Sequence, residues 1–361
     1  MNIDSIKKIE LEITSDCNAA CPGCARTLNV GKYEVTGFSL EDLKRIFPSQ
    51  RHIKDKMFKF CGVLGDPIVN PDCLDMVKYL ADNGGQAHLS TNAGYNNVAW
   101  WTELGEISKN NSAVQCFFAI DGHKETNHIY RVNTKWSVIE RNIEAYSLAG
   151  GKGSWIYIVF DHNEHELDIA RQHAEKLGYK FATRTGMRNS FHQWVSKTKK
   201  KDTETKKIVE EKKIITTTGK KEHTKAKEVK EIANKLKYAE RGLIEKNEIK
   251  EIMDTITCKL IHQGEIFISS KQTMWPCCFL FDSTVWNKDD INSKLAEYGD
   301  TWNSLKSHSI DDVLQHQYFA NVLQDSWDIQ HPKYMRRCAR TCAHKQAYHN
   351  EMHWEKKNVV K

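Results

Sequence analysis

A regular alternation of short apolar runs and helix-like stretches occupies the chain from residue 8 to about residue 185. Six apolar runs of strand length are predicted as strands: 9–14, 57–64, 86–91, 113–120, 154–160 and 179–185. Five stretches between them are predicted as helices: 39–47, 71–84, 97–108, 136–150 and 164–178. Such alternation is typical of a parallel sheet covered by helices.

Six strand and helix units favour an open barrel over a closed barrel of eight units. Right-handed crossovers between the parallel strands would wind the sheet in one direction. The sequence therefore predicts an α/β fold built on a partial (β/α)6 TIM-like barrel. In barrels of this kind the chemistry gathers in the loops that follow the carboxyl ends of the strands. We therefore expect the functional residues in those loops.

Local signals support the predicted helices. Ser39 lies three residues before Asp42, which is an N-cap pattern. Pro71 suits a first helical turn, and Gly84 suits a helix end. Asn163 is predicted as the N-cap of the fifth helix, because the neighbouring His and Glu residues do not have the H-E-x-x-H spacing of a zinc protease.

The eleven cysteines indicate metal binding. No run of eighteen apolar residues and no secretory signal are present, so we expect a cytosolic protein without membrane spans, where thiols stay reduced. Eight cysteines fall in two groups, and clustered thiols in that compartment favour metal over disulfides. The other three, Cys61, Cys73 and Cys116, lie in or beside apolar runs and are predicted to be core residues.

The first group, Cys17, Cys21 and Cys24, supplies three thiols within one predicted loop. Three thiolates can ligate three irons of a four-iron cluster and leave one iron without a protein ligand. Such an open position is what a catalytic metal site keeps for a small molecule. Structural zinc would need a fourth ligand, and no His lies between Met1 and His52, so the spacing favours an iron–sulfur cluster.

The net charge of +6 comes from one segment. Residues 196–250 hold 17 Lys and 1 Arg against 9 Glu and 1 Asp, whereas the rest of the chain holds 35 basic and 37 acidic residues. Mixed-charge runs of this kind are usually solvated surfaces, so the segment is predicted to be a solvated insertion that can steer an acidic partner. A nucleic-acid partner is therefore not expected.

Three more predicted strand ends carry Gly-rich or polar loops: "GVLGDP" (62–67), "STNAG" (90–94) and "IDGH" (120–123) followed by Arg131. With the cysteine spacing x3 and x2, these four elements in order resemble the signature of the radical S-adenosylmethionine (SAM) superfamily. The resemblance covers residues 8 to about 185. It implies a 4Fe-4S cluster on the three cysteines and SAM bound to the open iron.

The resemblance also implies a SAM site. Its residues would be Gly65, Asp66, Thr91, Asn92, Asp121 and Arg131. Two positions depart from the family pattern: Gly23 replaces an aromatic residue that packs near adenine, and Asp66 replaces a Glu. Neither change removes a thiol.

The second cysteine group resembles the C-terminal auxiliary-cluster extension called SPASM, in its shorter single-cluster form, twitch. Cys258, Cys277, Cys338 and Cys342 would saturate a second 4Fe-4S cluster, although Cys278 could substitute for Cys277. A zinc ribbon on the same four thiols is the alternative. The predicted division is a barrel (1–190), an insertion (191–250) and a small α+β auxiliary-cluster domain (251–361).

Together these features predict an enzyme that cleaves SAM reductively to a 5'-deoxyadenosyl radical, which abstracts hydrogen from a peptide side chain or a small metabolite. A reductant such as flavodoxin or ferredoxin would supply the electron. Oxidation or crosslinking would follow if the second cluster accepts an electron from the substrate. The sequence singles out no catalytic base. The rival hypothesis is a non-catalytic iron–sulfur or zinc protein that senses redox state or binds a partner.

Overall fold

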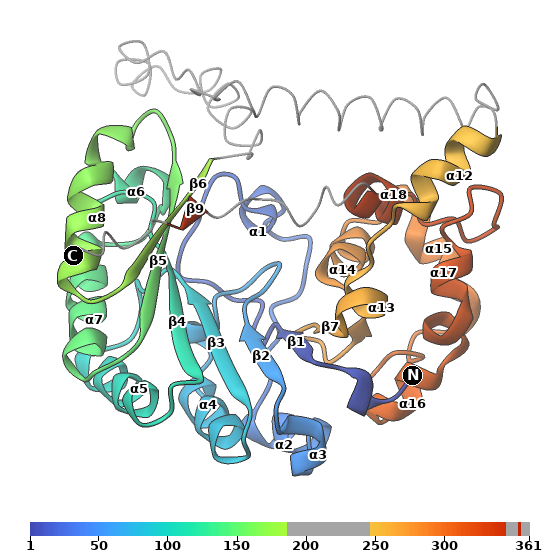
Figure 1. Cartoon of the computed structure of the whole chain (residues 1–361), viewed down its shortest axis with the longest axis horizontal. Helices are drawn as coiled ribbons and strands as arrows, with labels where there is room; N and C mark the ends of the chain where they lie inside the picture. Colours follow the sequence, from blue (N-terminus) through green and yellow to red (C-terminus); the bar gives the residue numbers. More distant parts are fainter. Residues whose placement is uncertain (186–245, 344–352, 355–361) are drawn as a thin grey trace, which may run out of the picture.

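The computed structural model describes residues 1–185, 246–343 and 353–354, and Figure 1 draws these as ribbon. Most of the predicted insertion, residues 191–245, lies outside the described residues. The described chain contains one nine-stranded sheet with the order β8-β7-β1-β2-β3-β4-β5-β6-β9.

Six neighbouring strands of this sheet are parallel, as predicted. They are β1 (Lys8–Leu11), β2 (Met57–Phe60), β3 (Gln86–Thr91), β4 (Val114–Ala119), β5 (Gly153–Val159) and β6 (Lys180–Thr185). The sheet curves without closing, and α4, α5, α7 and α8 line its outer side (Figure 1). The predicted α/β partial barrel is confirmed.

Helices and short turns connect the strands. They are α1 (Ala25–Leu28), α2 (Leu40–Ile46), α3 (Gln50–Ile53), α4 (Cys73–Asp82), α5 (Val98–Asn110), α6 (Asn127–Tyr130), α7 (Trp136–Leu148), α8 (Leu167–Lys176) and the 3-10 turns η1 (Ile3–Ser5), η2 (Pro67–Val69) and η3 (Glu164–Glu166). Alternate strand residues such as Phe58, Leu89 and Phe118 are fully buried in one core with the helices. The inner face carries polar residues, because the strand register places Glu10, Lys59 and His88 side by side.

Two of the local predictions hold and two are wrong. Ser39 caps α2 in a reciprocal capping box with Asp42, and Gly84 has a positive φ of 82° just after α4. Pro71 precedes its helix, because α4 begins only at Cys73. Asn163 makes no capping bond; instead its side chain donates to the carbonyls of Asp121 and Ile158 and ties two strand ends together.

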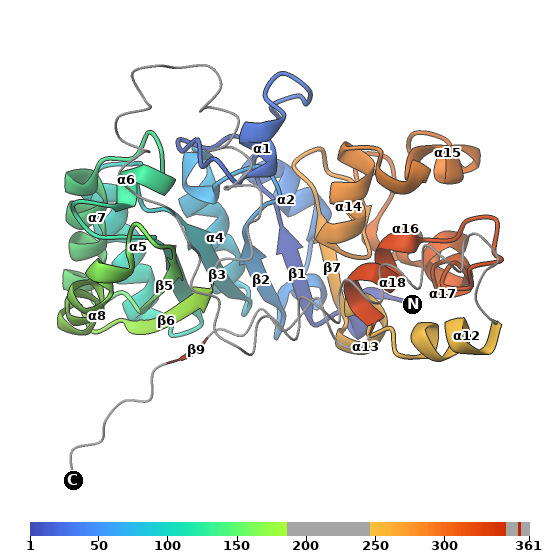
Figure 2. The same ribbon diagram turned by 90° about the horizontal axis from the view of Figure 1, so that it is seen from above.

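The C-terminal part continues the barrel sheet. β7 (Glu265–Ile268) pairs in parallel with β1, and β8 (Met274–Trp275) folds back on β7 as a hairpin. At the other edge the backbone of β9 (His353–Trp354) pairs antiparallel with β6. The other C-terminal elements are α12 (Lys246–Asp254), α13 (Lys259–Gln263), α14 (Cys278–Val285), η4 (Lys288–Asp290), α15 (Ile291–Leu295), η5 (Ala296–Tyr298), α16 (Ile310–Gln315), the π-helical turn η6 (Tyr318–Val322), α17 (Leu323–Asp325) and α18 (Arg336–Cys342). In Figure 2, α14 and α15 lie on the same side of the sheet as α1.

A buried ionic group joins the barrel to the C-terminal part. Lys259 Nζ lies 2.5 Å from Glu265 Oε1 and 3.4 Å from Glu10 Oε2, and Lys59 Nζ lies 3.2 Å from Glu10 Oε1. Burial alone would raise the pKa of Glu10, but Lys59 and Lys259 outweigh it and hold that pKa at about 2. Glu10 is therefore ionised, and its buried negative charge has to be compensated by Lys59 and Lys259. This need for both lysines favours the observed position of β7 beside β1.

The three cysteines predicted to lie in the core divide into two kinds. Cys73 and Cys116 are fully buried in the apolar core, as predicted. Cys61 is half-buried on the polar inner face, where its Sγ donates to Glu10 Oε1 at 3.1 Å, so its assignment to the apolar core is wrong. Cys61 directly follows β2. Because successive side chains along a strand point to opposite faces of the sheet, the Cys61 side chain lies on the inner face and not in the apolar core.

Within the described residues, none of the helices combines the length and the apolar character needed to span a membrane.

The capping box at Ser39 provides a test of the α2 boundary. Ser39→Ala removes the acceptor for the Asp42 backbone N–H, so the free energy of unfolding should fall by about 1 kcal/mol. Ser49→Ala is the matched control, because Ser49 occupies the N-cap position of α3 without a side-chain capping bond. Urea denaturation of both variants checks this, and equal losses would contradict the assigned role of Ser39.

Candidate functional site

The loop between β1 and α1 carries the three N-terminal cysteines at the carboxyl edge of the sheet. Cys24 is the N-cap residue of α1. The backbone N–H of Asp66 donates to the carbonyl of Asp16 at 2.8 Å, and that of Ala20 donates to Val132 at 2.9 Å. Loops after β2 and β4 thus fix the cysteine loop from two sides.

A small apolar cluster, separate from the main core, surrounds the three thiols. It contains Ala19, Cys21, Tyr130 and Phe160, with Cys17, Cys24 and Ile158 packed against it. The rings of Tyr130 and Phe160 lie 4.7 Å apart between centroids. Aromatic side chains from the loops after β4 and β5 therefore line the thiol site, although position 23 carries only a glycine.

Hydrogen-bond donors point at the sulfurs. The backbone N–H of Ala19 lies 3.4 Å from Cys17 Sγ, Asn92 Nδ2 lies 3.8 Å from the same sulfur, and Arg131 Nη1 lies 3.7 Å from Cys21 Sγ. Burial, reinforced by the Asp66 carboxylate, raises the pKa of Cys17 to about 12, and burial also raises the pKa of Cys21. A bound metal would displace these protons, and the donors would then stabilise the negative sulfurs.

The spacing of the thiols differs from that of a zinc site. Sulfurs around one tetrahedral zinc ion lie about 3.8 Å apart, given Zn–S bonds of about 2.3 Å. Among the described residues, the sets of three or more possible ligand atoms that all lie within 4.8 Å of one another contain no cysteine. They are Glu125, His165 and Glu166, and Glu140, Glu144 and His173. Cys17, Cys21 and Cys24 are therefore not all within 4.8 Å of one another.

Asp66 and Asn92, both predicted to contact SAM, meet beside the cysteine loop. Asp66 Oδ2 accepts from the backbone N–H of Asn92 at 2.8 Å and from its Nδ2 at 2.7 Å. The Asn92 side chain also exchanges two hydrogen bonds with Asn18, at 2.9 and 3.2 Å. Both residues are buried, and burial raises the pKa of Asp66. This network joins the loops after β1, β2 and β3.

Gly65 and Thr91 support the same junction through the backbone. A Cβ atom on Gly65 would lie 1.8 Å from the carbonyl oxygen of Thr14, so only glycine allows this approach of the two loops. Thr91 is buried, and its Oγ1 accepts from the backbone N–H of Ala93 at 3.1 Å. Both residues shape the edge on which the predicted SAM contacts lie.

Asp121 and Arg131 form a buried ion pair, with Arg131 Nη2 2.7 Å from Asp121 Oδ2. Asp121 is fully buried, and its Oδ1 accepts from the backbone N–H of Ile158 at 2.8 Å. The two charges therefore hold Arg131 in place beneath Cys21. Asp121 lies behind Arg131, so it orients the guanidinium rather than facing an open space.

The C-terminal cysteines gather in a second thiol site, here called the quartet: Cys258, Cys277, Cys338 and Cys342. Cys258 and Cys277 are the N-cap residues of α13 and α14, and Cys338 and Cys342 lie one turn apart on α18. Burial raises the pKa of Cys277 to about 12, with further increments from Cys258 and Cys342. All four side chains are buried.

Backbone N–H groups also act on the quartet. Those of Leu260 and Ile261 oppose the rise in the pKa of Cys258 that burial causes, and that of Leu280 opposes the rise in the pKa of Cys277. Helix N-termini favour negative charge, so both cysteines are placed where a metal-bound thiolate is stabilised.

The structure separates Cys277 from Cys278. The pKa of Cys278 is raised well above its ordinary value by burial and then by the carboxylate of Glu10, which belongs to the ionic group at β1. Helix α14 begins between the two cysteines, so their side chains diverge. Cys277 joins the quartet, whereas Cys278 faces the barrel interior.

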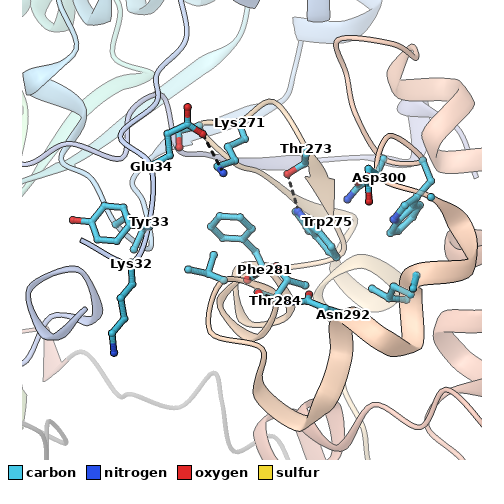
Figure 3. Close-up of a pocket in the computed structure, with 18 residues that line it drawn as sticks. Lys32, Tyr33, Glu34, Lys271, Thr273, Trp275, Phe281, Thr284, Asn292 and Asp300 are labelled. Atoms are coloured by element: carbon cyan, nitrogen blue, oxygen red, sulfur yellow. Dashed lines mark hydrogen bonds and ion pairs between the residues drawn. The ribbon is translucent and has the colours of Figure 1, made fainter. Parts of the chain in front are cut away.

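A cavity of about 440 Å³ lies between the cysteine loop and the C-terminal helices (Figure 3). Tyr33 and Phe281 both line it, and an ion pair of 3.4 Å joins two further lining residues, Glu34 and Lys271 (Figure 3). Burial raises the pKa of Tyr33, Arg26 opposes this rise, and Cys24 adds to it. None of the six predicted SAM contacts lines this cavity.

A buried carboxyl group lies behind the cavity wall. Glu12 Oε1 accepts from the backbone N–H of Leu64 at 2.8 Å, and Oε2 lies 3.4 Å from Ser270 Oγ. Leu64 and Ser270 both line the cavity. Glu12 is 1% exposed and has no lysine or arginine among its main electrostatic neighbours, so burial raises its pKa to about 7.

Sequence reasoning missed several residues of the site. Asn18, Glu12 and Tyr33 lie near or within the cysteine segment, so their place in the sequence was a usable signal. Tyr130 and Phe160 follow β4 and β5, where the rule that strand ends carry function also applies. Their contacts depend on tertiary packing and could not be read from the sequence.

No protein-family model and no curated protein sequence matches the chain. Solved structures give weak matches. SuiB of Streptococcus suis bound to its precursor peptide SuiA matches at 12% identity and a TM-score of 0.49, over 76% of this chain and 61% of SuiB. This chain therefore spans only about three fifths of SuiB.

Two further matches cover nearly the whole chain. The protein anSMEcpe with bound AdoMet and the Cp18Cys peptide matches at 13% identity and a TM-score of 0.48, over 94% of this chain and 89% of that one. BtrN in complex with AdoMet and 2-DOIA matches at 10% identity and 0.45, over 96% and 98%. TM-scores below 0.5 do not establish a common fold. The proposed function therefore rests on the sheet order and the two thiol sites of this chain.

The two adjacent cysteines provide a direct test of the quartet. Cys277→Ala should lower the metal content at the C-terminal site, because it removes one of four ligands. Cys278→Ala should leave it unchanged, because Cys278 faces Glu10. Metal analysis of the anaerobically purified variants checks this. Metal loss in Cys278→Ala but not in Cys277→Ala would reverse the assignment.

Glu12 provides a test of the buried carboxyl. Because its pKa rises from 4.5 to about 7 on folding, its protonated form stabilises the fold fully below about pH 4.5, and this contribution is lost as the pH rises through about 7. Its size is at most about 3 kcal/mol. The difference in unfolding free energy between the wild type and Glu12→Gln, measured by urea denaturation from pH 4.5 to 8, should fall with pH. A constant difference would show that Glu12 is ionised throughout.

Proposed function

We propose that this chain is a radical SAM enzyme with one auxiliary 4Fe-4S cluster. The observation that carries the proposal is the N-terminal site, where three cysteines of one loop meet in an apolar cluster beneath polar groups from three other strand ends. Three thiolates leave one iron of a four-iron cluster without a protein ligand. The four sequence motifs that resemble the superfamily supply the residues around that position.

The residues of the N-terminal site would act as follows. Cys17, Cys21 and Cys24 would ligate the cluster, and SAM would bind at the open iron. Asn92 and Arg131 donate toward the sulfurs, and they would contact SAM bound at the open iron. The other four proposed SAM-site residues hold this arrangement: Gly65, Asp66, Thr91 and Asp121.

When bound, the cluster and SAM would supply a 5'-deoxyadenosyl radical after reduction by a protein such as flavodoxin or ferredoxin. Tyr130 and Phe160 would exclude water from the site, which protects a reactive species from side reactions. The protein's task would be orientation and exclusion, while the cofactor supplies the chemistry.

The cavity lined by Tyr33 and Phe281 is the proposed substrate site. Tyr33 lines this cavity from the segment that follows Cys17, Cys21 and Cys24 in the chain. Phe281 lines it from α14, whose N-cap residue is Cys277. A substrate bound there would lose a hydrogen atom to the 5'-deoxyadenosyl radical formed at the N-terminal site and an electron to the cluster held by the quartet. These two steps together would give an oxidised or crosslinked product. The proposed substrate is a peptide side chain or a small metabolite of the cytoplasm.

The proposed organisation is a barrel (1–190), an insertion (191–250) and an auxiliary-cluster unit (251–361). The last unit would share a sheet with the barrel, because β7 pairs with β1. This sharing would keep the second cluster at a fixed distance from the first.

Anaerobic purification and product analysis test the proposal. The protein should contain about eight irons if two four-iron clusters are present. After reduction with dithionite it should release 5'-deoxyadenosine from SAM. Replacing Cys17, Cys21 and Cys24 together by Ala should abolish this release, because these thiols are the proposed ligands of the cluster that binds SAM.

Cys73→Ala is the matched control, because Cys73 is a buried cysteine of the main core on α4. It should keep both iron and product. Zinc at both sites, or iron without any 5'-deoxyadenosine, would instead support a non-catalytic metal protein that senses redox state or binds a partner.

A further inference from the structure

The hydroxyl of Tyr318 is buried without a hydrogen-bond partner among the described residues. Its residue is 0% exposed and begins the π-helical turn η6. A buried hydroxyl that makes no hydrogen bond costs about 1–3 kcal/mol, so this donor lacks the acceptor that would justify its burial. Turns of this kind often mark functional sites.

The surroundings of this hydroxyl are the quartet. Burial raises the pKa of Tyr318 well above its ordinary value, and the next largest causes are the sulfurs of Cys338, Cys277 and Cys258. Three of the four quartet thiols therefore act electrostatically on the Tyr318 hydroxyl. An acceptor held by these thiols would satisfy the hydroxyl.

The other side of Tyr318 faces the substrate cavity. Its ring packs edge-on against Trp302, with 5.0 Å between centroids, and Trp302 lines the cavity. Trp302 in turn packs edge-on against Trp275, another lining residue, at 5.8 Å. Tyr318 thus links the quartet, whose thiols act on its hydroxyl, to the cavity wall, which its ring contacts.

We propose that the Tyr318 hydroxyl donates a hydrogen bond to a sulfur atom of the cluster held by the quartet, and so raises the reduction potential of that cluster. This inference rests on the proposed function. Reduction adds negative charge to a cluster, and a donor at its sulfur stabilises that charge. The proposed electron transfer from the cavity to the quartet becomes more favourable as a result.

Tyr318→Phe tests this role, because it removes the hydroxyl and keeps the ring against Trp302. The background is the full chain with Cys17, Cys21 and Cys24 replaced by Ala, so that the C-terminal cluster gives the electron paramagnetic resonance signal. The midpoint potential of Tyr318→Phe should be more negative than that of its parent. Tyr298→Phe, the same substitution at a neighbouring half-buried ring 6.1 Å away, should leave the potential unchanged.

A second measurement covers a variant that loses its metal. Electron–nuclear double resonance of the reduced parent protein should show one strongly coupled proton, and this proton signal should disappear in deuterated buffer. The Tyr318→Phe variant should lack the signal in ordinary buffer as well. If Tyr318→Phe binds no iron, the absence of such a proton in the parent alone would overturn the proposal.

The outcomes separate the two proposals. An unchanged potential in Tyr318→Phe, an equal shift in Tyr298→Phe, or zinc in the quartet would overturn the role of Tyr318. Failure to release 5'-deoxyadenosine from the wild-type protein would overturn the proposed function, while the potential of the C-terminal cluster would still report on Tyr318.

Discussion

The pairing of β1 with strands on both of its sides fixes the geometry of the whole site. β1 lies between β2 and β7, so the loop that follows it begins between the barrel and the C-terminal part. The register aligns Glu10 with Lys59 on one side and with Phe267 on the other. A shift of one residue would turn Glu10 away from its lysines and expose a buried carboxylate, so this register is strongly specified.

The two thiol sites share one physical design. Each places a buried cysteine, Cys21 in one site and Cys277 in the other, beside a group that favours a negative sulfur: Arg131 donates to Cys21, and the backbone N–H of Leu280 opposes the rise in the pKa of Cys277. Burial keeps such thiols protonated in the absence of metal, and donors favour the metal-bound form. The N-terminal site has three thiol ligands, whereas the quartet has four. For this reason SAM is proposed to bind at the N-terminal site, and the quartet is proposed to accept an electron.

Much of the barrel could be predicted from the sequence, because its signals are local. The apolar runs gave β3 at its observed bounds, and the Ser39 pattern gave the α2 cap. The prediction failed where tertiary contacts compete with local pattern: Asn163 looks like a cap but bonds to two strand ends. Likewise, the pairing of β7 with β1 joins segments about 250 residues apart, which no periodicity reveals.

The candidate site was predictable in its thiols but not in its supporting groups. Spacing alone could not separate Cys277 from Cys278, because the start of α14 sends the two side chains in different directions. Tyr318 sits in an aromatic run that is typical of packing, and what distinguishes it is full burial of the residue together with a hydroxyl that makes no hydrogen bond among the described residues. Burial and hydrogen-bond partners are properties of the folded chain, so sequence patterns carry little information about them.

The three N-terminal thiols are proposed to leave one iron open for SAM. Electron–nuclear double resonance of the reduced protein, with SAM labelled at the methionine amino nitrogen and carboxylate, detects whether SAM binds that iron. Both labels should couple to the cluster, and the coupling should disappear when Cys17, Cys21 and Cys24 are replaced. A signal from the cluster on these three cysteines without either coupling would show that SAM does not bind the open iron.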